Sequence, residues 1–220
     1  MNISLFFNGG FFMNINNKNK IGEVAFKLSI EYGFDNMTIK QIQDEANVSV
    51  GAVYYHFKDK NDILDYIIDI YIRNEIKKFK ENIRNYKGSL PKKLKLLFYH
   101  YLGKDFEETN CSIRLLNNEM INHTEYTLFL LGIYHHYPDF RHYFHEFNMD
   151  MLNFYKEIVD DFKKNNEIRR EIDTEDIAIQ IFTTVSGFIT LWGGFQPNLK
   201  LEKFMDANIQ MICDYVEIKD

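Results

Sequence analysis

A short stretch of the chain, residues 49–60, carries side chains that suit contact with nucleic-acid phosphates. Hydroxyl, imidazole and ammonium groups gather there, on Ser49, Tyr54, Tyr55, His56 and Lys60. Such groups donate hydrogen bonds to phosphate oxygens, which orient a protein on DNA but do not by themselves read its sequence. The chemistry of this stretch therefore favours a helix that lies against a DNA backbone.

The tip of the same stretch has few groups that read bases. Val50 and Gly51 offer apolar contact and close approach of the backbone, whereas bidentate readout needs longer polar side chains. We therefore expect sequence specificity to depend on Lys40 and Gln41, in the preceding segment, and on the shape of the DNA.

Other interpretations stay open for three of these residues. Tyr54 could belong to the core, Tyr55 suits packing and DNA contact equally well, and His56 could be a solvated surface residue. Phe57 has the helical offset of a core residue.

Three short helices, with a tight turn before the third, are predicted to position these side chains. Apolar residues recur at three- and four-residue steps from Lys18, which predicts the first helix. The residues that end or cap the helices are Gly33 after the first, Thr38 before the second, Asn47 after the second and Ser49 before the third. This is a helix-turn-helix arrangement, whose third helix must be narrow at its tip and braced from behind to enter a major groove. Asp59 caps a fourth, long helix that we expect to reach Tyr86.

The segment IGEVAFKLSIEYGFDNMTIKQIQDEANVSVGAVYYHFKDKNDIL, residues 21–64, resembles the DNA-binding domain of the TetR family of repressors. The resemblance rests above all on SVGAVYYHF, residues 49–57, followed by Lys58 and Lys60. It implies contacts to backbone and groove by Thr38 and Lys40, to bases by Ser49, Val50 and Gly51, and to phosphates by Tyr54, His56 and Lys60. Gln43 and Asn47 depart from the family, which usually has Ala and Gly at these positions.

The composition predicts an all-α protein whose N-terminal part is mildly basic and whose C-terminal part is acidic. Residues 1–100 hold 15 Lys and Arg against 11 Asp and Glu, a net charge of +4, whereas the whole chain of 220 residues carries −6. We expect a flexible tail over 1–17, a helix-turn-helix domain over 18–64, and a helical ligand-binding and dimerisation domain over 65–220, joined to it by the long helix.

The cysteines and the apolar runs bear on the compartment. The two cysteines are far apart and form no CxxC pair, which excludes a zinc knuckle and argues against a disulfide framework. No apolar run reaches the roughly 18 residues of a membrane span. We therefore expect a cytoplasmic protein without a membrane partner.

The C-terminal half resembles the family only loosely, through its last two helices. In the family, these helices form a four-helix bundle with their copies in a second subunit. The apolar stripes predicted to pair are Ile181, Val185, Phe188 and Trp192 on one helix and Ile209, Ile212 and Val216 on the other. The alternative for both stripes is the core of a single chain.

Aromatic and methionine side chains between residues 90 and 170 are candidates to line a pocket for an apolar effector. They are Phe98, Tyr101, Leu102, Phe106, Leu116, Met120, Phe129, Ile133, Phe147, Met151, Phe154 and Tyr155. For any single one of them, ordinary core packing is the alternative. His142 and Glu146 have helical spacing, but without an HExxH motif or a nearby cysteine we expect no metal and no cofactor.

The resemblance implies a homodimeric repressor that binds a palindromic operator in double-stranded DNA and is released by a small apolar or aromatic molecule. A ligand-dependent activator or co-regulator and a partner-regulated DNA-binding protein remain alternatives. The chain has no phosphate-binding glycine loop, nucleophile elbow or paired catalytic acids, so an enzyme is not expected.

Overall fold

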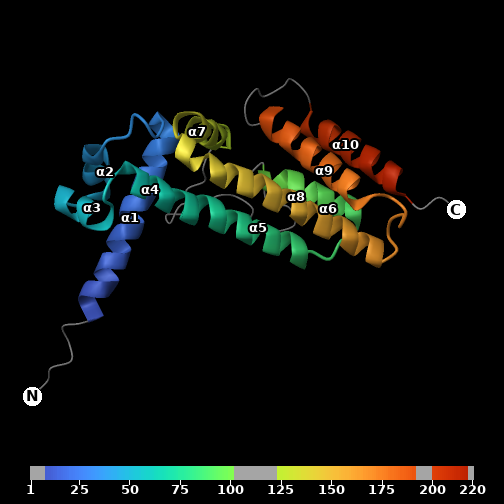
Figure 1. Ribbon diagram of the computed structural model, residues 1–220, viewed down its shortest axis with the longest axis horizontal. Coiled ribbons are helices and arrows are strands. Elements are labelled where there is room, and N and C mark those ends of the chain that lie inside the picture. The colour runs from blue at the N-terminus through green and yellow to red at the C-terminus, as the bar shows by residue number, and fades with distance from the viewer. Residues whose placement is uncertain (1–7, 102–122, 192–199, 218–220) are drawn as a thin grey trace, which may run out of the picture. The chain divides into compact units, whose positions relative to one another are not determined.

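The computed structural model of the chain describes residues 8–101, 123–191 and 200–217, and all its regular elements there are helices (Figure 1). The predicted all-α class is confirmed. The described residues form two compact units, which meet in sequence between Ile76 and Lys77.

The first unit contains the three helices of the predicted helix-turn-helix arrangement, of which only the second and third are short, and the start of the long fourth helix. Its elements are α1 (Asn8–Tyr32), α2 (Ile39–Ala46), α3 (Val50–His56), α4 (Lys60–Ile67) and a π-helical segment, η1 (Ile68–Arg73). Helix α1 contacts α2, α3 and α4. It begins at Asn8, ahead of the predicted start at Lys18, and the predicted boundary after Leu64 lies within α4. The boundaries at 17 and 64 stay predictions.

The predicted helix ends of this unit are confirmed by its caps. Gly33 and Asn47 have positive φ angles of 84° and 49° after their helices. The Thr38 side chain accepts a hydrogen bond from the backbone of α2, Ser49 Oγ accepts from Ala52 N at 3.1 Å, and Asp59 Oδ1 accepts from Asp62 N at 2.9 Å. N-terminal caps of this kind each stabilise a helix by about 1 kcal/mol, so these three side chains fix where α2, α3 and α4 begin.

The long helix predicted from Asp59 contains a π turn that periodicity did not indicate. Residues 68–73 are π-helical between α4 and α5 (Asn74–Asn85). Tyr71, inside this segment, stacks on Phe26 of α1 with 4.4 Å between ring centroids. The segment IDIYIR contains no glycine or proline to mark the change, and π turns of this length are often found at functional places in helices.

The second unit packs the remaining helices around an apolar core. After α5 come α6 (Leu90–Tyr101), α7 (His123–His136), a 3-10 turn η2 (Pro138–Phe140), α8 (Arg141–Lys164), α9 (Thr174–Ile189) and α10 (Leu201–Val216). Helix α8 contacts α7 and α9, and α6, α9 and α10 contact one another. Pro138 begins the turn η2 that leads into α8, and Asp173 caps α9, since its Oδ1 accepts from the amides of Glu175 and Asp176.

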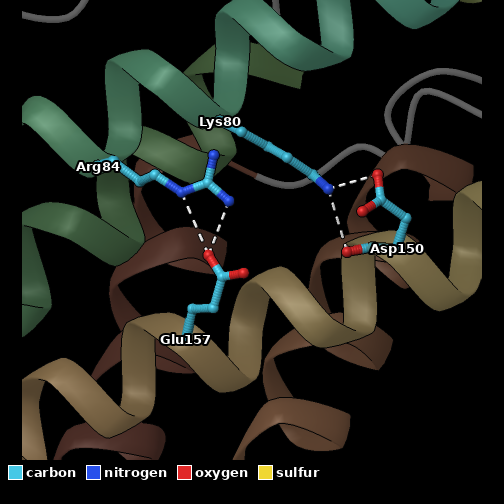
Figure 2. Close-up of polar contacts among 4 residues, drawn as sticks. All are labelled: Lys80, Arg84, Asp150 and Glu157. Carbon is cyan, nitrogen blue, oxygen red and sulfur yellow. Dashed lines mark hydrogen bonds and ion pairs between the residues drawn. The ribbon is translucent and has the colours of Figure 1, made fainter.

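Two ion pairs join α5 to α8 in this unit (Figure 2). Lys80 is buried; its ammonium pairs with the Asp150 carboxylate and donates to the Asp150 carbonyl at 3.1 Å. One turn along α5, Nε and Nη2 of Arg84 both donate to Glu157 Oε2, at 3.2 and 2.7 Å. Both cations also lie over the ring of Phe154, at 5.5 and 5.1 Å from its centroid. These contacts fix α5 along α8.

The two pairs differ in burial, which predicts different contributions to stability. Asp150→Ala should lower the free energy of unfolding by about 2 kcal/mol, because it removes the carboxylate from a buried ammonium. Glu157→Ala, at a matched position of the same helix, should cost less than about 1 kcal/mol, since that pair is solvent-exposed. Chemical denaturation measures both, and equal costs would contradict this assignment.

Candidate DNA-binding interface

Helix α3 has one exposed and one buried face. Val50, Tyr54 and Tyr55 are 43%, 54% and 72% exposed, and Ser49 and Gly51 are exposed beside them. Val53 and Phe57 are buried, as predicted for Phe57. The polar and small side chains selected from the sequence therefore share the open face, and the core alternative for Tyr54 does not hold in this structure.

The buried face of α3 is braced by an aromatic contact between Phe57, at the end of α3, and Tyr66 of α4. The Tyr66 ring meets the Phe57 ring edge-on at 5.4 Å, and its hydroxyl donates to Asn19 Oδ1 at 2.7 Å. Gly22 lets Tyr66 approach α1, because a Cβ there would stand 2.2 Å from the ring. The Lys18 ammonium lies over both rings, 5.4 Å from the Phe57 centroid and 5.2 Å from that of Tyr66. The sequence did not single out Asn19, Gly22 or Tyr66, whose contacts span α1 and α4.

The start of α2 is organised by a capping box that uses one of the predicted reading residues. Gln41 Oε1 accepts hydrogen bonds from Thr38 N and Thr38 Oγ1, both at 2.8 Å, and Thr38 Oγ1 accepts from Gln41 N at 3.2 Å. The carboxamide oxygen of Gln41 is thereby engaged within the protein. Lys40 and Thr38 are exposed at the same end of the helix.

Lys60 is held by the main chain of the α1–α2 connector. Its ammonium donates to the carbonyl oxygens of Phe34, Asp35 and Met37, at 2.8, 3.1 and 2.9 Å. An ammonium group has three hydrogens to donate, so a phosphate contact would require it to release a carbonyl. Burial lowers the pKa of Lys60, and the charge of Asp35 partly offsets this.

His56 is half-buried at the end of α3, with its ring edge-on to Tyr55 at 5.0 Å between centroids. Burial lowers its pKa from the ordinary 6.5, and the positive charge of Lys18 lowers it further. The imidazole is therefore mostly neutral at pH 7, and one ring nitrogen can act as a neutral hydrogen-bond donor.

The structure buries most of the predicted pocket residues that it describes. Phe98, Phe129, Ile133, Met151, Phe154 and Tyr155 are buried, and Phe147 is half-buried. Leu102, Phe106, Leu116, Met120 and the side chain of Tyr101 lie outside the described residues. Phe154 meets Phe79 of α5 edge-on at 5.9 Å, which links this cluster to the long helix.

The stripes predicted to pair with a second subunit face the core of the chain itself. Ile181, Val185, Phe188, Ile209, Ile212 and Val216 are all buried within one chain, and Trp192 lies outside the described residues. Phe188 packs against Phe98 of α6 and Phe204 of α10. These side chains are not available to a partner, and this part of the prediction is corrected. The exposed faces of α9 and α10 instead carry Ile179, Met211 and Tyr215, at 43%, 71% and 56% exposure.

The remaining chemistry in the described residues is sparse. Within 8–101, 123–191 and 200–217, His, Cys, Asp and Glu side chains form no group of three or more placed to hold a metal ion. Over the same ranges, the helices are too short or too polar to span a membrane.

Comparison with known proteins places residues 21–67 in the sequence family described as bacterial regulatory proteins, tetR family. The HTH-type transcriptional regulator SAB2452 of Staphylococcus aureus is 27% identical over 94% of this chain and 97% of its own length. SAUSA300_2515, from another strain, is 40% identical over 26% of this chain and 32% of its own.

Solved structures share the fold at lower identity. A TetR-family regulator from Cytophaga hutchinsonii has a TM-score of 0.69 at 13% identity, covering 94% of this chain and 98% of its own. FadR from Bacillus subtilis, solved in complex with stearoyl-CoA, has a TM-score of 0.63 at 20% identity, covering 88% and 96%.

The environment of His56 predicts its titration. In the DNA-free protein, NMR should give His56 a pKa below 6.5, and Lys18→Met should raise it by removing the nearby charge. Lys20→Met, an exposed position on the same helix, is the control and should leave the pKa unchanged. Because the folded state binds this proton less tightly than the unfolded chain, the stabilising contribution of neutral His56 is lost as pH falls below about 6.5. A pKa above 6.5, or an identical response to both substitutions, would contradict the assignment.

Proposed function

This chain belongs to the TetR family of bacterial transcriptional regulators, and from that premise we propose that it is a dimeric repressor released from a palindromic operator by an apolar effector. The observation that supports this proposal most strongly is the open face of α3. Its hydroxyl-bearing and small residues are exposed while Val53 and Phe57 seat the helix from behind. A helix that enters a major groove needs this combination of a free tip and a rigid base.

The proposed DNA contacts divide by chemistry. Tyr54 and His56 contact phosphates, and Ser49, Val50 and Gly51 approach the bases. The 72% exposure of Tyr55 favours DNA contact over packing for that residue. Because the tip carries little bidentate chemistry and the Gln41 oxygen serves the capping box, specificity rests on Lys40 and on DNA shape. Residues 18–64 hold six Lys against seven Asp and Glu, so approach to DNA depends on individual exposed lysines such as Lys40 and Lys58 rather than on the net charge of this segment.

The proposed dimer uses the outer faces of α9 and α10. These helices contact each other, and their exposed sides carry Ile179, Met211 and Tyr215 among small or neutral residues such as Thr183 and Ala207. Large apolar side chains exposed on two neighbouring helices support an interface at this surface. Pairing this face with the same face of a second copy gives a dimer with two α3 helices, one for each half-site of the operator.

We place the proposed effector between α7 and α8, which contact each other and carry the buried side chains Phe129, Ile133, Met151 and Phe154. Phe154 contacts Phe79, so a ligand that displaces its ring acts directly on α5. Residues 60–85 are helical throughout, which offers a mechanical route toward α3. A coupling free energy of about 1–3 kcal/mol suffices for release, provided that the ligand prefers the released state. The FadR complex with stearoyl-CoA supports an elongated acyl ligand.

The function is tested by selecting duplexes that bind the full-length protein from a random pool. We expect an inverted repeat with half-sites about one helical turn apart. Tyr54→Phe should then weaken binding to every duplex to a similar extent, because it removes a phosphate contact, and Phe keeps the packing. Fluorescence anisotropy measures the affinities. Failure to enrich any sequence, or enrichment of an asymmetric one, would count against the proposal.

The dimer face is tested by paired charge substitutions. Ile179→Glu with Met211→Glu should give a folded monomer that no longer binds the selected operator, because two negative charges replace the apolar contact. Met149→Glu, at an exposed position of α8, is the matched control and should remain a dimer. By contrast, Ile181→Glu with Phe188→Glu should unfold the second unit, since both side chains are buried. Light scattering and circular dichroism separate these outcomes. If the variant with Glu at positions 179 and 211 remained a dimer, the proposed interface on α9 and α10 would be wrong.

The effector site is tested by titrating the operator complex with stearoyl-CoA. The wild-type protein should release DNA, and Met151→Trp, which fills a buried position, should either release DNA unaided or need more ligand. Phe147→Trp, at a half-buried position, is a comparison in which a smaller change is expected. Unchanged DNA binding and release by Met151→Trp would place the effector elsewhere, and no release of the wild-type complex would exclude this acyl ligand.

A further inference from the structure

The contact between Lys60 and the α1–α2 connector joins parts of the chain that are far apart in sequence. The ammonium lies at the first helical position of α4, directly after its cap Asp59, and reaches carbonyls 23 to 26 residues earlier. It also lies 5.1 Å from the centroid of the Phe34 ring. The start of the long helix is thereby tied to the loop that leads into α2.

The α1–α2 connector requires a hydrogen-bond donor such as the Lys60 ammonium because its apolar side chains are buried in the core of the unit. Phe34 and Met37 are buried, and Ser29 Oγ, itself buried, lies 3.5 Å from Met37 Sδ. The carbonyl groups of Phe34 and Met37 are thereby partly withdrawn from water, and hydrogen-bond donors within the protein offset this loss. One ammonium supplies three donors at a single point, with the ring of Phe34 beneath it.

The connector in turn sets the position of the reading element. Met37 is followed at once by Thr38, the cap of α2, and α2 contacts α3. A displacement of the connector would therefore shift the capping box with Gln41 and, through α2, the exposed tip of α3.

We infer that Lys60 is a positioning residue that locks the α1–α2 connector to the first turn of α4, and that it is not a phosphate contact. This inference rests on the proposed DNA-binding function of the same unit. It replaces the phosphate role that the family resemblance implies, because all three donors of the ammonium are engaged inside the protein. Any movement of α4 then reaches α2 through this contact as well as through α1.

The first test compares Lys60→Met with Lys40→Met, both in the full-length protein. Lys60→Met keeps an unbranched side chain one atom shorter but removes the ammonium, and should lower the midpoint of thermal unfolding by about 5 °C. At a temperature where it is fully folded, it should bind the selected operator several-fold more weakly with an unchanged dependence on salt. Lys40→Met should instead keep the midpoint and reduce the salt slope by about one. A slope reduced by about one in Lys60→Met, or an unchanged midpoint, would overturn the inference.

A destabilised control separates positioning from stability alone. Ile68→Val removes a buried methyl group from the same unit, outside the connector, and should lower the midpoint without weakening operator binding at low temperature. If Ile68→Val and Lys60→Met lose affinity in proportion to their midpoints, Lys60 acts only on stability and the positioning role is wrong.

A second measurement uses the unaltered protein and does not depend on a variant that folds. Acetylation of lysines, followed by mass spectrometry, should modify exposed Lys58 and Lys40 rapidly and Lys60 slowly in the absence of DNA. Mixed-sequence duplex DNA should protect Lys40 and leave Lys60 unchanged. Rapid modification of free Lys60 that DNA suppresses would show a phosphate contact. If the protein binds no DNA at all, Lys40 stays unprotected and the proposed function fails, while the DNA-free arms still decide the Lys60 contact.

Discussion

The close approach of Tyr66 to Gly22 is the constraint on which the reading element depends. Helix α3 is only seven residues long, so it cannot hold its own position and needs a rigid base. Tyr66 provides that base by meeting Phe57 edge-on while its hydroxyl binds Asn19, and only a residue without a Cβ leaves room for the ring at position 22. The Lys18 ammonium lies over both rings. Burial lowers the pKa of the nearby His56, and the charge of Lys18 lowers it further.

The second unit holds the long helix against its core through an aromatic contact and two ion pairs. The Phe79 and Phe154 rings meet inside the unit, and the Lys80–Asp150 and Arg84–Glu157 pairs flank them. The ion pairs resist sliding of α5 along α8 because their geometry is directional. In the proposed switch, a ligand that moved α5 would have to break these pairs as well as the aromatic contact.

Helices α9 and α10 each have one buried stripe and one exposed stripe. The more apolar stripe of α9, with Ile181, Val185 and Phe188, packs against the chain's own helices. The opposite stripe is less apolar and carries Ile179, with Thr183 and Gly187 in the turns that follow it. An interface between subunits is in general less apolar than a core, so the division of the two stripes agrees with the proposed dimer.

The sequence by itself determined the helices and their ends, because these depend on residues three or four positions apart. Thr38, Ser49, Asp59 and Asp173 cap their helices through amides two or three residues ahead, and Gly33 and Asn47 take their left-handed conformations locally. Only the tertiary structure decided which stripe of α9 is buried, since both stripes have helical spacing and the choice depends on α6 and α8. It also decided that Lys60 binds connector carbonyls, that Gly22 admits Tyr66, and that residues 68–73 form a π turn beside Phe26. Each of these depends on contacts between segments far apart in sequence, which residue spacing along one helix does not encode.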